Sequence, residues 1–88
     1  MKLNFTGRTA LITGGSGGIG LSIVKKLIEN KIKVIILDIN TPNKNILLNK
    51  LVEFKKTDLS DSENLQLCLI EITKKHKKIE YVINAAGV

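Results

Sequence analysis

The chain has 88 residues and a formal net charge of +6, with 43% hydrophobic and 25% charged residues. This length corresponds to a single domain, residues 1–88, with the composition of an ordinary soluble globular protein. No apolar run approaches the roughly 20 residues that cross a bilayer. The N-terminus lacks the apolar segment of a secretory signal, and Cys68 is the only cysteine, which excludes an internal disulfide. We therefore expect a cytoplasmic protein with no membrane partner.

The positive charge comes almost entirely from lysines spread along the chain. One arginine, Arg8, and few aromatic residues leave little for reading or stacking on bases. The densest basic run, 74–78, falls at the predicted end of a helix, where cations interact favourably with the helix dipole. We expect no nucleic-acid partner, and we expect His76, within that run, to be a solvated surface residue.

The first half of the chain alternates apolar runs with a helical pattern. Arg8–Thr13 predicts a buried strand that ends at a group of glycines. Apolar residues recurring with a period of 3.6 predict a helix over Gly18–Asn30, and Asn30 is expected to end it in the left-handed conformation. Lys33–Asp38 is apolar without alternation, which is typical of a parallel strand covered on both faces.

The middle of the chain predicts a loop over Ile39–Asn45, a short helical turn over Ile46–Lys50 and a third strand over Val52–Thr57. Ser60 and Glu63 match a capping box, with Ser60 at the N-cap.

The helix that follows should run to Lys75, with its apolar residues, including Cys68, facing the core. Ile79–Asn84 predicts a fourth strand.

Strands that alternate with helices imply right-handed crossovers and a parallel sheet. The fold class is therefore α/β, a Rossmann-like doubly wound sheet with the β-α-β-α-β-α-β order of an N-terminal portion and the strand order 3-2-1-4. The fourth strand is apolar and would have a bare outer edge, which invites pairing or aggregation. We expect the fold to be incomplete at residue 88.

A glycine-rich segment lies between the first strand and the first helix. It reads Thr13, Gly14, Gly15, Ser16, Gly17, Gly18, Ile19 and Gly20. A helix N-terminus carries unpaired N–H groups and a partial positive charge, and glycines let a pyrophosphate approach them. Leu21 stands where a P-loop requires lysine, so that alternative fails. A glycine turn that binds nothing is the other interpretation.

Asp38 ends the second strand, where an acidic residue hydrogen-bonds the ribose hydroxyls of NAD and repels the 2′-phosphate of NADP. No lysine or arginine lies at Ser16, Gly17, Ile39 or Asn40 to neutralise that phosphate. The pattern therefore favours NAD over NADP.

These motifs together resemble the short-chain dehydrogenase/reductase family. The glycine segment resembles its TGxxxGxG cofactor loop, Asp38 its NAD-selecting acid, and Asp58-Leu59 its contact to adenine. Residues 84–87 resemble its Asn-Asn-Ala-Gly motif, with alanine at the second position. The resemblance implies a cofactor site made of the glycine segment together with Asp38, Ile39, Asp58, Leu59, Asn84, Ala85, Ala86 and Gly87.

The family's chemistry uses a Ser, a Tyr and a Lys that have no counterpart here. Tyr81 is the only tyrosine, and Ala85 follows it where Tyr-x-x-x-Lys requires lysine. We interpret Tyr81 as a packing residue within the strand. The sequence thus predicts no catalytic residues and no metal site.

The resemblance implies the cofactor-binding part of an oxidoreductase that would act on an alcohol or carbonyl substrate only in a complete chain. The helices that build the family's oligomers are also absent. A stand-alone NAD-binding regulatory module and a decayed remnant remain the alternatives.

Overall fold

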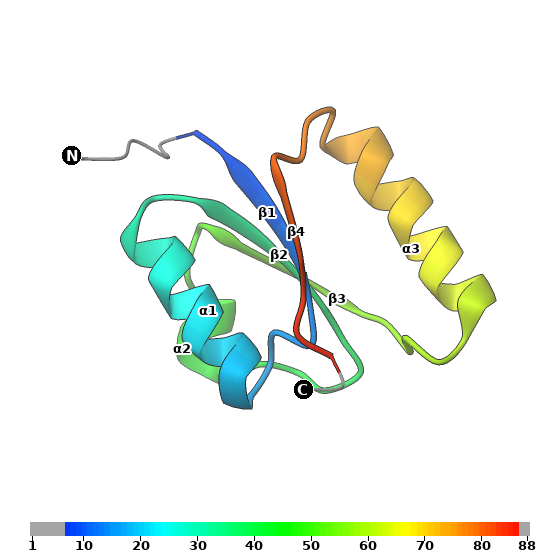
Figure 1. Ribbon diagram of the computed structural model, residues 1–88, viewed down its shortest axis with the longest axis horizontal. Coiled ribbons are helices and arrows are strands. Elements are labelled where there is room, and N and C mark those ends of the chain that lie inside the picture. Colours follow the sequence, from blue (N-terminus) through cyan, green and yellow to red (C-terminus); the bar gives the residue numbers. More distant parts are fainter. Residues whose placement is uncertain (1–6, 87–88) are drawn as a thin grey trace.

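The computed structural model describes residues 7–86. The elements in chain order are β1 (Thr9–Thr13), α1 (Gly18–Glu29), β2 (Lys33–Asp38), α2 (Lys44–Leu47), β3 (Val52–Lys56), α3 (Ser62–Lys75) and β4 (Tyr81–Asn84). The strands form a parallel sheet in the order β3-β2-β1-β4, which confirms the predicted order. Helices α1 and α2 cover one face of this sheet and α3 covers the other (Figure 1).

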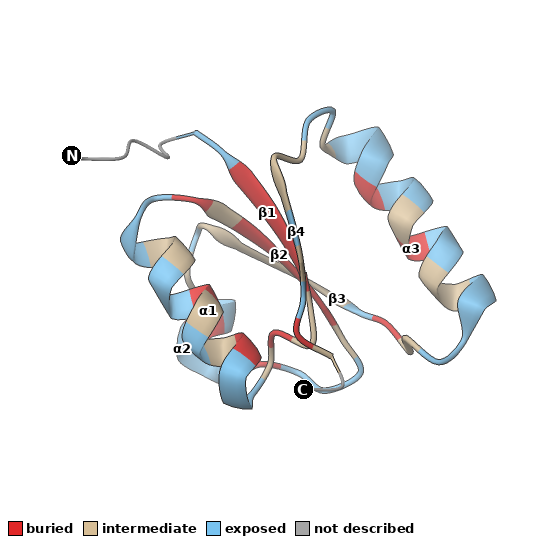
Figure 2. Ribbon diagram, viewed as in Figure 1, coloured by how far each residue is buried: buried red, intermediate tan, exposed pale blue. Residues whose placement is uncertain are grey.

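The central strands β1 and β2 bury both of their faces, as their continuous apolar sequences predict. Ile12 and Ile36 pack with Val24 of α1 on one side of the sheet. Leu11 and Ile35 belong to the second cluster, on the side of α3. Figure 2 shows the buried residues concentrated in these two strands.

The strand register brings the carboxyl ends of the strands together. Thr13 lies opposite Leu37 of β2 and opposite Asn84 of β4. Asp38 lies opposite Lys56 of β3. The residues that follow all four strands therefore meet at one edge of the sheet, where open α/β sheets bind their ligands.

The end of α1 differs from the sequence prediction. Asn30 has φ −94°, whereas Lys31 has φ +62° and takes the left-handed position. Ile32 N donates to Leu27 O and Lys31 N donates to Ile28 O, which is the hydrogen-bond pattern of a Schellman motif. The Asn30 side chain instead donates to Lys26 O at 2.8 Å. The prediction for Asn30 was wrong, since Lys31 takes the left-handed position and the Asn30 amide caps a carbonyl of the preceding turn.

The start of α3 also differs. Its N-cap is Asp61, whose carboxylate accepts from the N–H groups of Glu63 and Asn64. Ser60, the predicted cap, donates its hydroxyl to Asp58 Oδ1 at 2.6 Å. A carboxylate one residue closer to the helix therefore takes the capping role.

Several smaller boundaries shift: β1 begins at Thr9 rather than at Arg8, and α2 ends at Leu47 rather than at Lys50. The short helix α2 begins at Lys44 rather than Ile46 because the Asn43 side chain caps it. The strand β3 ends at Lys56 rather than at Thr57, and β4 begins at Tyr81 rather than at Ile79. Tyr81 is half-buried at the start of β4, and its hydroxyl accepts from Arg8 at 3.4 Å.

His76 is not the solvated residue that the sequence predicts. Its side chain is only 9% exposed, and its Nε2 lies 3.2 Å from Oε1 of Glu53 on β3. Lys75 Nζ lies 2.7 Å from the same oxygen. The C-terminal end of α3 is thus tied to β3 by a carboxylate shared between two basic side chains.

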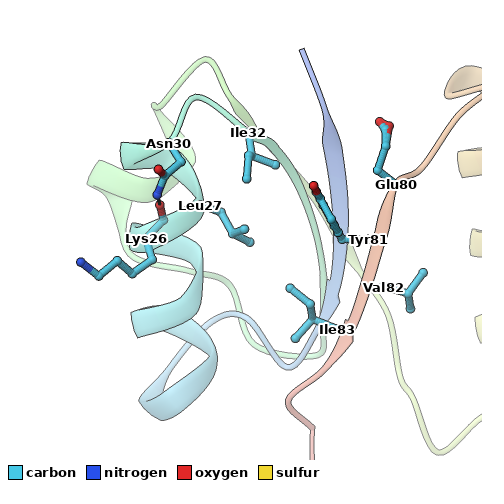
Figure 3. Close-up of a pocket in the computed structure, with 8 residues that line it drawn as sticks. All are labelled: Lys26, Leu27, Asn30, Ile32, Glu80, Tyr81, Val82 and Ile83. Atoms are coloured by element: carbon cyan, nitrogen blue, oxygen red, sulfur yellow. Dashed lines mark hydrogen bonds between the residues drawn. The ribbon is translucent and has the colours of Figure 1, made fainter. Parts of the chain in front are cut away.

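The strand β4 pairs with β1 and, in the described part of the chain, has no partner on its other side. Val82 is 72% exposed there. A pocket of about 480 Å³ lies beside this edge. Figure 3 shows Leu27 of α1 and Ile83 of β4 pointing into the space between these elements, while Val82 points away. In the described part of the chain, β4 is therefore an edge strand of the sheet, as expected.

Candidate nucleotide-binding site

The glycine loop after β1 is packed closely against neighbouring backbone at its two ends. Gly14 has φ +77°, and a β-carbon there would lie 2.7 Å from the backbone N of Ala86. A β-carbon at Gly20 would overlap the carbonyl oxygen of Gly14. Gly14 N also donates to Leu37 O at 2.8 Å. Glycine is therefore required at both positions by the fold itself.

The centre of the same loop is open. A β-carbon on Gly17 or Gly18 would meet nothing within 4 Å. Gly17 is the N-cap of α1, no side chain caps this helix, and its first turn contains no acidic residue. The N-terminus of a twelve-residue helix thus keeps its positive dipole end and its N–H groups accessible to an anion.

Asp38 lies across from this loop and is held by main-chain donors. Its Oδ2 accepts from Ser16 N at 3.1 Å, and its Oδ1 accepts from Asn40 N at 2.9 Å. A carboxylate has about four acceptor positions. Asp38 can therefore accept further hydrogen bonds from a ligand while it remains fixed.

Asp58 has a local role at the end of β3. Its Oδ1 accepts from both the N–H and the hydroxyl of Ser60, at 3.0 and 2.6 Å. The hydrogen bond from the Ser60 hydroxyl, with that from its backbone N–H, lowers the pKa of Asp58. The main-chain N of Asp58 donates to the Asn64 side chain at 2.8 Å. These contacts fix the turn that forms the outer wall of the site.

The ends of β1 and β4 are joined by side chains. Thr13 Oγ1 donates to Asn84 Oδ1 at 2.8 Å, and Ala85 N donates to Thr13 O at 2.9 Å. Ala85 is buried beneath the glycine loop. Gly87, also predicted in the site, lies outside the described residues.

A groove of about 420 Å³ unites many of the predicted residues. It is lined by Gly14, Gly17, Asp38, Ile39, Asp58, Leu59, Ala85 and Ala86, together with Asn40, Thr57 and Ser60, which sequence reasoning did not assign to the site. Each of these last three residues is next in sequence to a predicted site residue. This adjacency is the sequence signal that could have identified them.

Other predicted residues lie close to the groove without lining it. Gly15 and Gly20 are buried beneath the loop, and Ile19 is 57% exposed on the first turn of α1. Thr13 and Asn84 line a separate pocket on the α3 side of the sheet. Their contribution to the groove is the placement of the loop and of the end of β4.

Residues 7–86 contain neither a candidate metal-binding cluster nor a candidate membrane-spanning helix. No group of three His, Cys, Asp or Glu side chains there could hold a metal ion. No helix in that range is long and apolar enough to cross a membrane.

Residues 8–88 match the family model described as short chain dehydrogenase. The chain belongs to the short-chain dehydrogenase family. A curated member, 3-oxoacyl-[acyl-carrier-protein] reductase of Chlamydia pneumoniae, is 33% identical over 94 aligned residues, which cover all of this chain and 38% of the reductase. The chain thus spans well under half the length of this relative.

Solved structures of the family agree with the fold. A short-chain dehydrogenase from Leptospira borgpetersenii with bound NAD+ has a TM-score of 0.87 and 27% identity, over 97% of this chain and 33% of that protein. ElxO with NADP bound has a TM-score of 0.78 and 25% identity, over 92% of this chain and 35% of ElxO. Structural relatives therefore hold NAD+ in one case and NADP in another.

Proposed function

We propose that this chain is the NAD-binding part of an oxidoreductase that interconverts an alcohol and a carbonyl compound. The observation that carries the proposal is the pairing of two features in one groove. The uncapped N-terminus of α1, at Gly17, and the fixed carboxylate of Asp38 both line it. The first suits a pyrophosphate and the second suits ribose hydroxyls.

The site residues fit such a cofactor because the loop leaves space where side chains would otherwise stand. In this proposal the N–H groups at Gly17–Gly20 bind the pyrophosphate, and Asp38 accepts from the adenosine ribose. Asp58 and Leu59 form the wall on the adenine side. Ala85 and Ala86, at the end of β4, bound the groove beneath the glycine loop.

The charges of the groove support NAD over NADP. Its lining, among the residues described, includes Asp38 and Asp58 but no lysine or arginine. A 2′-phosphate placed near Asp38 would be repelled by that carboxylate without a cation to compensate.

Bound NAD would supply hydride acceptance or donation. The residues of this chain bind and orient the cofactor. In this proposal, the groups that bind the small-molecule substrate and move its proton lie in further parts of a complete protein. This follows from the family's larger size, since the reductase from Chlamydia pneumoniae is matched over only 38% of its length.

The test is titration of the protein with NAD and with NADP by calorimetry, comparing wild type with Asp38→Ala. We expect NAD to bind more tightly than NADP, and we expect the substitution to remove that preference. Glu29→Ala is the matched control, because Glu29 is an exposed acid at the far end of α1. A folded wild-type protein that binds neither nucleotide would refute the proposal.

A further inference from the structure

Ser16 connects the glycine loop to the turn after β2 through two hydrogen bonds. Its N–H donates to Asp38 Oδ2 at 3.1 Å, and its hydroxyl donates to the carbonyl oxygen of Asn40 at 2.5 Å. Asn40 N in turn donates to Asp38 Oδ1 at 2.9 Å. The three residues form a closed ring of contacts around one carboxylate.

Only one of these donors belongs to a side chain. The two N–H groups that hold Asp38 are main chain and persist in any non-proline variant. The Ser16 hydroxyl is therefore the one group in the ring that a substitution can remove without touching Asp38 or the backbone. Its acceptor, Asn40 O, lies in the same residue whose N–H fixes Asp38 Oδ1.

We propose that Ser16 is a positioning residue that sets the preference for NAD over NADP by holding the Asn40 turn, and through it the Asp38 carboxylate, against the glycine loop. This inference rests on the proposed function. A carboxylate held at both oxygens cannot rotate aside to admit a 2′-phosphate. Its remaining acceptor positions are presented to ribose hydroxyls. Without the Ser16 hydroxyl the turn loosens and Asp38 gains freedom to move away.

Three variants test this by measuring dissociation constants for NAD and NADP in the protein. Ser16→Ala is expected to weaken NAD binding and to lower the NAD-over-NADP preference about threefold to tenfold, the range expected for one net hydrogen bond. Ser16→Thr keeps a hydroxyl and should restore the preference. Ser22→Ala is the matched control, since the Ser22 hydroxyl is exposed and contacts only Gly18 O, at 3.4 Å. It should leave both constants unchanged.

A second measurement separates positioning from direct contact. Ser16→Ala introduced into Asp38→Ala should cause no further change in the NAD-to-NADP ratio, because Ser16 acts through Asp38. An equal change in both backgrounds would show that Ser16 touches the cofactor itself and would overturn the inference.

A third readout uses the protein without cofactor. Hydrogen exchange at the Asn40 amide should accelerate about threefold to tenfold in Ser16→Ala and remain unchanged in Ser22→Ala. Unchanged exchange together with an unchanged ratio would refute the inference while NAD binding by wild type still supports the proposed function. Failure of wild type to bind NAD would refute the proposed function and the inference together.

Discussion

Gly20 and Gly14 are in such close contact that a β-carbon on Gly20 would overlap the carbonyl oxygen of Gly14. The neighbouring atom belongs to the backbone, so it can move aside only at a substantial cost in free energy. We expect Gly20→Ala to lower the free energy of unfolding by about 2 kcal/mol, despite the better helix propensity of alanine. Urea denaturation measures this change.

Gly17→Ala is the matched control for that experiment. Gly17 has φ −163°, an extended conformation that any residue adopts, and a β-carbon there would meet nothing within 4 Å. The free energy of unfolding of Gly17→Ala should stay within about 0.5 kcal/mol of wild type. Equal losses in the two variants would contradict the role assigned to the contact between Gly20 and Gly14.

Lys31 takes the left-handed conformation, with φ +62°. A side chain in this conformation costs roughly 1 kcal/mol relative to glycine, so we expect Lys31→Gly to stabilise the protein by about 0.5–1 kcal/mol. Thermal unfolding measures the shift. Lys25→Gly, at an exposed position within α1, should instead destabilise by about 1 kcal/mol. A loss of stability in Lys31→Gly would show that the side chain makes a compensating contact.

The sequence predicted most of the architecture because its strands are continuous apolar runs and α1 has a clear helical period. It could not choose between neighbouring polar residues that compete for one role. Asn30 and Lys31 compete at the end of α1, and Ser60 and Asp61 compete at the start of α3. Each outcome depends on which carbonyl or N–H the side chain reaches once the backbone is placed.

Contacts between residues far apart in the chain could not be predicted from the sequence, for a different reason. The contact between His76 and Glu53 joins residues 23 positions apart, and the lysines around His76 resemble a solvated run. In the site, the main-chain donors that hold Asp38 carry no sequence signature. The place of Asp38 at the end of β2 could be predicted. The hydrogen bonds that Ser16 and Asn40 donate to its carboxylate could not.

Glu53 should make stability depend on pH. Burial raises the pKa of Glu53, but the hydrogen bonds and the charge attraction from Lys75 and His76 together outweigh it and lower the pKa below its ordinary value of 4.5. A carboxyl whose pKa is lowered in the folded state adds stability above its unfolded pKa, and that stability is lost as pH falls through the folded pKa. The free energy of unfolding should therefore decline on acidification below about pH 5.

Glu53→Gln tests this pH dependence. We expect it to cost about 1 kcal/mol at pH 7 and to flatten the decline below pH 5, measured by urea denaturation across pH. Glu29→Gln, on the exposed end of α1, should leave the profile unchanged. An identical profile for Glu53→Gln and wild type would rule out the shared carboxylate as its source.

Thr57 is fully buried, and its hydroxyl donates to Lys55 O at 3.0 Å and lies 3.4 Å from Cys68 Sγ. Thr57→Val keeps the shape but leaves the carbonyl without this donor, so we expect a loss of about 1 kcal/mol in denaturation. Thr73→Val removes an equivalent hydroxyl, donated to Ile70 O at 3.0 Å on the exposed surface of α3. That variant should change stability by less than about 0.5 kcal/mol, and a larger effect there would contradict the importance of burial.

The position of β1 between β2 and β4 has a consequence for folding kinetics. Thr13 and Asn84 are 71 residues apart, so pairing β4 with β1 closes a long loop, whereas β1 and β2 are joined through one intervening helix. Loop-closure entropy and contact order make such distant pairings late and slow. We therefore expect β1, α1 and β2 to form the folding nucleus, so that the glycine loop and Asp38 come together early. The wall contributed by Ala85 and Ala86 would then be added only later, when β4 pairs with β1.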